Sequence, residues 1–260
     1  MGHSDRRQRR APRPTSEHHQ GLVHPRSLRR LLALQQRGSG HLTRRLVEVK
    51  AQRARSSSLE GSSVSFLVPI KSFVDAKERL ATVLDPDQRR SLAKELAAGV
   101  LEATKIANTA VVCDDDEVAT WADQRGASVI WAPGKGLNGA VAAGVHRLKT
   151  RGYERITVVH ADLPFPERLR SLPHVDGVLL VPDRRRDGTN VLGIPASAPF
   201  TFSYGRASFA RHCEEATRMG LTTEVVNDDE LSIDVDLPED LAEMRARARQ
   251  RGPEGPRVTT

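Results

Sequence analysis

The stretch that decides the fold is RITVVHADLP, residues 155–164. It has the pattern of a buried strand, residues 155–160, that runs directly into a carboxylate and then into a proline turn. A continuous apolar run of this kind is typical of a strand covered on both faces, as in a parallel sheet. Ligands of such sheets bind beyond the carboxyl ends of the strands. Asp162 is therefore the first candidate for a functional residue, with capping of a following helix as the structural alternative.

Outward from this strand, strand patterns alternate with helical spacing between Ser62 and Arg251, which predicts one α/β domain with a mostly parallel sheet covered by helices on both faces. The expected strands are 64–70, 109–113, 128–131, 155–160, 177–181, 191–194, 223–226 and 233–235. The expected helices are 86–107, 115–125, 138–150, 206–219 and 238–251. Asp85 is expected to cap the first of these helices, because Pro86 suits the first helical position.

Charge is unevenly distributed along the chain. Of the 40 basic and 33 acidic residues, 14 and 4 lie in residues 1–61, which leaves 26 and 29 for the remainder. We expect 1–61 to be a basic, disordered extension, 62–251 to be the domain, and 252–260 to fray. The extension could contact nucleic acid through phosphate charge, but the lack of interleaved aromatic residues argues against this.

Other classes of protein are disfavoured by composition. No apolar stretch approaches the length of a membrane span. Cys113 and Cys213 lie far apart in the sequence and fit neither a disulfide framework nor a zinc motif. These features predict a reduced, cytoplasmic protein.

A second carboxylate pattern occurs in SIDVDLP, residues 232–238, where another expected strand ends in Asp before a Leu-Pro turn. Asp234 and Asp236 would face the same side of an extended chain. Carboxylates that converge from separate strand ends suit Mg²⁺, which keeps several waters and takes further ligands from substrate phosphates. A triphosphate would complete such a site, and no covalent nucleophile is needed. His160 and His212 are interpreted as ordinary strand-end and helix residues.

Two further regions could bind anions. Lys71, Lys77 and Arg79 follow the first strand, where a loop and a helix start offer cations and backbone donors to phosphates; a solvated helix face of mixed charge is the alternative. The turn GKGLNG, residues 134–139, is a candidate for receiving a base or ribose. Thr189, Ser208 and the backbone of Gly205 are small donors that could hold a carboxylate or phosphate, although turn and capping roles fit equally well.

Six segments resemble, in order, the CofC/FbiD family of guanylyltransferases of coenzyme F-420 biosynthesis. They are PIKSFVDAKERLA (69–81), GLNGAV (136–141), ADLP (161–164), DGTNVL (187–192), YGRASFARH (204–212) and DVDLPEDL (234–241). The resemblance implies a single Rossmann-like nucleotidyltransferase domain of the glycosyltransferase A type, and a homodimer in some members. Ala161 departs from the family pattern, which more often has Gly there.

The resemblance also implies an activity: GTP gives GMP to phosphoenolpyruvate, 2-phospho-L-lactate or 3-phospho-D-glycerate, and pyrophosphate leaves. The resemblance implies that Asp162 and Asp236 bind Mg²⁺ and are catalytic. It implies that Lys71, which would contact phosphate, is the third catalytic residue. The implied acceptor-binding residues are Thr189, Gly205 and Ser208, and the implied GTP-binding residues are Lys71, Lys77, Arg79 and Asn138. The alternatives are a related nucleotidyltransferase acting on a sugar phosphate or pterin, and a non-catalytic nucleotide- or nucleic-acid-binding module.

Overall fold

A computed structural model describes residues 63–105 and 107–251. Its strands are β1 (Val64–Pro69), β2 (Asn108–Cys113), β3 (Ser128–Trp131), β4 (Arg155–Val159), β5 (Val178–Pro182), β6 (Thr189–Pro195) and β7 (Thr223–Val225). Its helices are α2 (Pro86–Thr104), α3 (Asp116–Gln124), α4 (Gly136–Thr150), α5 (Ser208–Arg218) and α6 (Pro238–Arg251), with 3-10 helices η1 (Glu78–Leu80) and η2 (Pro166–Ser171). The predicted extension 1–61 and the predicted tail 252–260 lie outside the described residues, so both remain predictions.

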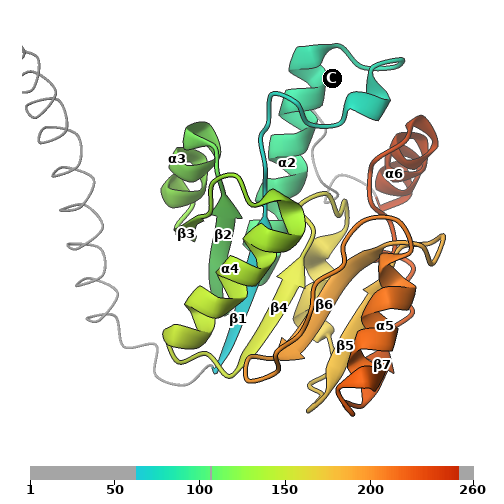
Figure 1. Ribbon diagram of the computed structural model, residues 1–260. Coiled ribbons are helices and arrows are strands. Elements are labelled where there is room, and N and C mark those ends of the chain that lie inside the picture. Colours follow the sequence, from blue (N-terminus) through green and yellow to red (C-terminus); the bar gives the residue numbers. More distant parts are fainter. Residues whose placement is uncertain (1–62, 106, 252–260) are drawn as a thin grey trace, which may run out of the picture. The chain divides into compact units, whose positions relative to one another are not determined.

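The strands form one seven-stranded sheet in the order β3-β2-β1-β4-β6-β5-β7 (Figure 1). Strand β6 pairs antiparallel with both β4 and β5, whereas every other pairing is parallel. The predicted α/β fold with a mostly parallel sheet is therefore confirmed. The carboxyl ends of β1, β2 and β4 lie at one edge of the sheet, and the antiparallel β6 begins at that same edge.

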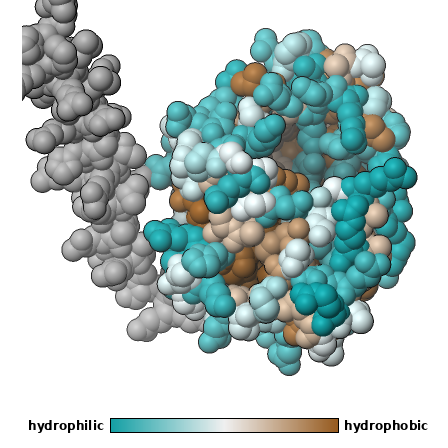
Figure 2. Space-filling view, in the orientation of Figure 1, coloured by the Kyte–Doolittle hydropathy of each residue, from teal (hydrophilic) through white to brown (hydrophobic). Residues whose placement is uncertain are grey.

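Alternation along β1 divides the core into two layers. Phe66 and Val68 belong to the apolar cluster that includes residues of α2 and α3, whereas Leu67 belongs to the cluster that includes residues of α4 and α5. Successive side chains of a strand point to opposite faces, so both faces of this sheet are covered. Burial of a side chain such as that of Leu67 contributes roughly 1.5–3 kcal/mol. On the face shown in Figure 2 the described surface is mostly hydrophilic, with apolar residues gathered in a hollow near its centre.

The predicted cap of the first long helix is present. The Asp85 carboxylate accepts the N–H of Gln88 at 2.9 Å, and the Gln88 side chain accepts the N–H of Asp85 at 3.0 Å, which completes a capping box. This start fixes α2, whose Ala93 and Ala97 line the cavity described below. None of the described helices combines the length and the apolarity that crossing a membrane would require.

The prediction of a final strand at residues 233–235 is wrong. Within the described residues, this segment makes one isolated backbone bond to the sheet region, from Val235 N–H to the carbonyl of Asp162, and the preceding Ser232 accepts one from Arg184 N–H. Strands β4 and β5 already have a partner on each side in the sheet order. The segment therefore passes beyond the ends of these strands and does not extend a ladder.

Replacement of Asp85 by Ala is expected to lower the free energy of unfolding by about 1 kcal/mol, because one N-terminal N–H of α2 loses its acceptor. Urea unfolding measures the change. Asp87→Ala is the matched control, since Asp87 lies in the same first turn without accepting the cap bond. Equal effects of the two substitutions would contradict a specific capping role.

Candidate active site

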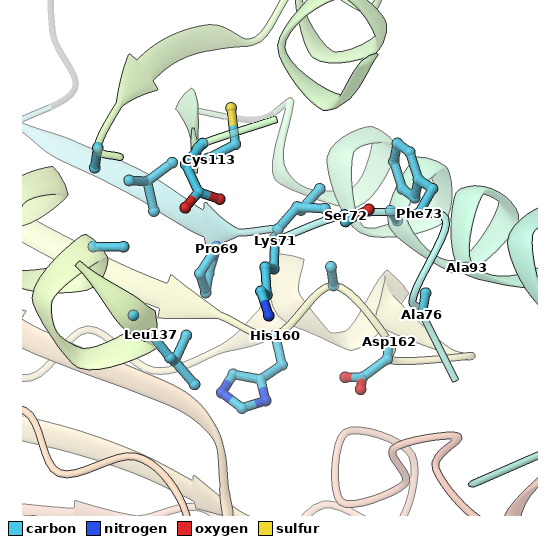
Figure 3. Close-up of a pocket in the computed structure, with 18 of the residues that line it drawn as sticks. Pro69, Lys71, Ser72, Phe73, Ala76, Ala93, Cys113, Leu137, His160 and Asp162 are labelled. Carbon is cyan, nitrogen blue, oxygen red and sulfur yellow. The ribbon is translucent and has the colours of Figure 1, made fainter. Parts of the chain in front are cut away.

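A cavity of about 610 Å³ opens at the carboxyl edge of the sheet, between the loop after β1, the end of β2, the start of α4 and the segment after β4. This volume lies within the range of roughly 300–1,000 Å³ that is typical of small-molecule sites. Lys71, His160 and Asp162 project toward the same space from two adjacent strand ends (Figure 3). The fold therefore places the predicted site residues Lys71 and Asp162 around one cavity, together with His160, which was interpreted from the sequence as an ordinary strand-end residue.

The carboxylates of Asp162 and Asp236 are brought together around one ammonium group. Lys77 Nζ lies 2.8 Å from Oδ2 of Asp162 and 3.2 Å from Oδ1 of Asp236. The Lys77 side chain is only 9% exposed, so these ion pairs are shielded from water. Arg79 Nη1 lies 3.4 Å from Oδ2 of Asp236 but is 72% exposed, which makes it the weaker contact.

Burial and the neighbouring charges shift the pKa values of Lys77, Asp162 and Asp234. Burial lowers the pKa of Lys77, but Asp162 and Asp236 outweigh burial, and the pKa ends above its usual value. Burial likewise raises the pKa of Asp162, and Lys77 and His160 reverse this, so that the pKa of Asp162 is lowered. The pKa of Asp234 rises to about 7, through burial first and then through the charges of Asp162, Asp236 and Asp183. The site thus contains three neighbouring aspartates, Asp162, Asp234 and Asp236, and one buried ammonium group, that of Lys77.

Backbone geometry explains how Lys77 reaches both carboxylates. Lys77 adopts a left-handed conformation, with φ of 58°, immediately before η1. Such a conformation is unfavourable for a residue other than glycine, and in folded proteins it concentrates at functional sites. Sequence reasoning gave Lys77 a role toward GTP and did not predict its position between the two aspartates.

Asp240 holds the second aspartate in place, and sequence reasoning did not single it out. Its buried carboxylate accepts the backbone N–H groups of Asp236 at 3.2 Å and of Leu237 at 2.7 Å. It also pairs with Arg184 and Arg185 from the loop between β5 and β6. An Asp as the third residue of an expected helix was the available signal, since short polar side chains near helix starts bind free backbone N–H groups.

The carboxylates fit a hard divalent cation. Oδ1 of Asp162 and Oδ1 of Asp234 are buried and have no hydrogen-bond partner within the described residues. Unused carboxylate oxygens of this kind are the ligand type that magnesium prefers. Within residues 63–105 and 107–251, no group of three or more acidic, His or Cys side chains is arranged to enclose a metal by itself.

Two other residues predicted to bind phosphate or nucleotide, Lys71 and Asn138, differ in their position relative to the cavity. Lys71 is exposed and lines the cavity. Asn138 is not among the residues that line it: its Nδ2 donates to the carbonyl of Tyr204 at 3.2 Å, and its Oδ1 accepts the N–H of Tyr204 at 2.6 Å. The side chain of Asn138 thus links α4 to the loop that carries Gly205.

The predicted acceptor residues meet beside the end of β4. The hydroxyls of Thr189 and Ser208 lie 3.4 Å apart, and the N–H of Ser208 donates to the carbonyl of Gly205 at 3.0 Å. The N–H of His160 donates to the carbonyl of Asn190, which ties the start of β6 to the end of β4. The structure therefore brings Thr189, Gly205 and Ser208 together near His160, which lies two residues before Asp162.

His212 is a further polar residue of this region, which sequence reasoning interpreted as an ordinary helix residue. Its fully buried ring accepts the N–H of Ser203 at Nε2 over 3.0 Å, and its Nδ1 lies 3.0 Å from Oγ1 of Thr189. Because Nε2 accepts a bond, the neutral ring carries its proton on Nδ1 and donates it to Thr189. The spacing of four residues from Ser208 was the signal that the two side chains share a helix face.

The sheet is mostly parallel, carboxylates converge beside a buried lysine, and a cavity lined by an exposed lysine opens at the carboxyl edge. This is the arrangement expected of a nucleotidyltransferase. The chain belongs to the family described as "Guanylyl transferase CofC like", whose model matches residues 64–250. The family predicted from the six sequence segments is therefore confirmed.

Curated relatives agree with this family. The chain is 34% identical over 192 residues to the phosphoenolpyruvate guanylyltransferase of Sphaerobacter thermophilus, a match that covers 70% of this chain and 92% of that protein. It is 27% identical over 183 residues to the 2-phospho-L-lactate guanylyltransferase of Methanocaldococcus infernus, covering 68% and 82%. Among solved structures, a nucleotidyl transferase from Methanothermobacter has the same fold, with a TM-score of 0.55 at 13% identity over 74% of this chain and 100% of that one.

The buried His212 is expected to make folding sensitive to acid. Burial first, and then His160 and Arg211, lower its pKa from 6.5 to about 4. The unfolded chain thus takes up this proton near pH 6.5 while the folded ring stays neutral, so the stabilisation is complete above this pH and is lost as the pH falls toward 4. Between about pH 7.5 and about pH 5, the wild-type protein should lose about 1–2 kcal/mol more unfolding free energy than His212→Gln, whose side chain does not titrate.

Urea unfolding of both proteins at the two pH values measures this difference. His160, whose pKa burial also lowers, is present in both proteins and cancels from the comparison. Identical losses in the two proteins would show that His212 is protonated in the folded state as readily as in the unfolded chain.

Proposed function

We propose that the protein transfers GMP from GTP to a three-carbon phospho-acid and releases pyrophosphate. The observation that carries the proposal is the convergence of Asp162 and Asp236 on Lys77, because Lys77 and Asp162 also line the cavity of about 610 Å³. The hydroxyls of Thr189 and Ser208 lie close together outside the cavity wall, beside the end of β4. The names of the curated relatives supply the donor and the acceptor class.

In this reaction, a phosphate oxygen of the acceptor attacks the α-phosphorus of GTP, and the bond from that phosphorus to the bridging oxygen of pyrophosphate breaks. Phosphoryl transfer needs little covalent participation from the protein and depends on positioning and charge stabilisation. The exposed ammonium of Lys71 would bind the triphosphate inside the cavity, and the thiol of Cys113 is no competing nucleophile because burial raises its pKa to about 11.

Asp162 and Asp236 would hold magnesium, whose remaining ligands would be water and phosphate oxygens. When bound, the cation would spread the negative charge of the reacting phosphoryl group. Lys77 would then exchange part of its contact with the carboxylates for contact with the triphosphate. A buried lysine that already compensates the acidic cluster is suited to this role because it carries its charge in both situations.

Thr189, Ser208 and the backbone at Gly205 would bind the acceptor. The proton that His212 donates to Thr189 leaves the threonine hydroxyl hydrogen free to bond an anionic oxygen. Phosphoenolpyruvate is the first acid to test, because the relatives at 34% identity carry its name, with 2-phospho-L-lactate and 3-phospho-D-glycerate next. The product would enter coenzyme F-420 biosynthesis. Assembly as a homodimer and a cytoplasmic location are part of the same proposal.

Asp162→Asn and Asp236→Asn are each expected to lower the rate of pyrophosphate release at least about a hundredfold, the order observed when a group that stabilises transition-state charge is removed. Release is measured with GTP and each of the three acids, with and without magnesium. Asp229→Asn is the matched control, because this exposed carboxylate lies outside the cavity wall. An Asp162→Asn or Asp236→Asn enzyme with activity near that of the wild type would remove the proposed metal site.

Thr189→Val and Ser208→Ala are expected to raise the KM for the acid about tenfold or more, since a hydrogen bond to a charged group is worth about 1.5–3 kcal/mol. The KM for GTP should stay within about twofold, because both hydroxyls lie apart from the cavity that would hold the nucleotide. Thr189→Ser keeps the hydroxyl and is the control. A rise in the KM for GTP of the same size would place these hydroxyls in the nucleotide site.

A further inference from the structure

The cavity has two chemically different ends. Lys77 and Asp162 line one end, and Asp114 and Gly134 line the other. Strand β1 lies between β2, which Asp114 follows, and β4, which precedes Asp162. Because neighbouring strands lie about 4.8 Å apart, the ends of β2 and β4 are separated by roughly 10 Å. A nucleotide whose phosphates lie near Asp162 would therefore extend its base toward Asp114.

The wall near Asp114 suits a flat aromatic ring. Val112, Ala132, Leu137 and Ala140 line this side of the cavity and present only apolar atoms from their side chains. Leu137 is 43% exposed, which leaves an apolar surface within the cavity that a base could cover. The phosphates of a nucleotide would find no charge partner on this wall.

Asp114 is one of two carboxylates that line the cavity, and the other, Asp162, is bound to Lys77. Asp114 makes no ion pair within the described residues 63–105 and 107–251; its Oδ2 accepts only the N–H of Gly134, at a long 3.4 Å. Its second oxygen and the remaining lone pairs are free to accept further bonds. An ionised carboxylate accepts hydrogen bonds and donates none.

Guanine is the common base that matches such a group. Its N1–H and its 2-amino group are adjacent donors on one edge, and two carboxylate oxygens can accept both at once. Adenine and cytosine present a ring nitrogen acceptor beside their amino group, and this acceptor would face a carboxylate oxygen. A site built around a polar group discriminates strongly against ligands that leave the group unpaired.

We propose that Asp114 selects guanine, by accepting the N1–H and the 2-amino group of the base at the end of the cavity opposite Asp162. This assignment rests on the proposed function, since it identifies the residue that makes the enzyme specific for GTP. Asp114 acts as a specificity-determining residue and does not contact the reacting atoms.

Asp114→Asn tests the assignment through a gain of function. The amide oxygen of Asn still accepts N1–H, but its NH₂ group would face the 2-amino group of guanine, whereas the 2-carbonyl of xanthine would accept a bond from it. The wild-type enzyme should prefer GTP over XTP, and Asp114→Asn should reverse this preference, with a change in the ratio of kcat/KM values of about a hundredfold or more. A misfolded variant would not gain activity with XTP, so a gain cannot result from misfolding.

Asp116→Asn is the matched control, because Asp116 is an exposed carboxylate two residues along the chain that does not line the cavity. It should keep the wild-type preference for GTP. ITP, which lacks the 2-amino group, should be used by the wild-type enzyme about tenfold less efficiently than GTP. Retained GTP preference in Asp114→Asn, or loss of GTP use without a gain with XTP, would overturn the assignment.

Direct calorimetric binding of GTP and XTP, in the absence of acceptor, separates this inference from the proposed function. Absence of pyrophosphate release with all three acids would count against the proposed reaction alone. The inversion of binding preference between wild type and Asp114→Asn would still support base selection by Asp114, and its absence would refute it.

Discussion

Compensation of negative charge at one edge of the sheet is the constraint on which this site depends. Burial first, and then the nearby charges of Asp162 and Asp236, disfavour the ionised form of Asp234 and raise its pKa. The buried ammonium of Lys77 offsets the repulsion through two short ion pairs. Lys77 reaches both carboxylates from a left-handed backbone conformation, which costs about 1–2 kcal/mol for a residue other than glycine. The positive charge of Lys77 thus reduces the net negative charge of the site, so that several carboxylates can lie close together.

Sheet topology arranges the groups in a functional order. Along the carboxyl edge, β2 is followed by Asp114, β1 by Lys71 and β4 by Asp162, and the antiparallel β6 begins there with Thr189. In the proposed reaction this order corresponds to base, triphosphate, metal and acceptor. The reversal of β6 is what brings an acceptor residue to this edge, since a parallel β6 would have started at the opposite edge.

Supporting residues give the arrangement its precision. Asp240 fixes the backbone of Asp236, Asn138 fixes that of Tyr204, and His212 orients the hydroxyl of Thr189. Each of these side chains is engaged on both of its polar atoms, and Asp240 and His212 are fully buried. Side chains held in this way restrict the positions of the groups that would contact substrate, which is how a rigid sheet can support positioning by loops.

The sequence by itself determined the fold class and the family, and it indicated Lys71, Asp162 and Thr189 at the sheet edge, because strand periodicity, turn residues and segments such as ADLP are local patterns. It did not single out Asp114. Only the tertiary structure decided that Lys77 lies between the aspartates, that residues 233–235 pass beyond the sheet, and that Asn138 faces Tyr204. It also decided that His212 meets Thr189. These outcomes depend on contacts between residues 20 to 160 positions apart, such as His212 with Thr189 and Lys77 with Asp236. A local pattern specifies which residues end a strand, and the packing of distant segments specifies what each side chain meets there.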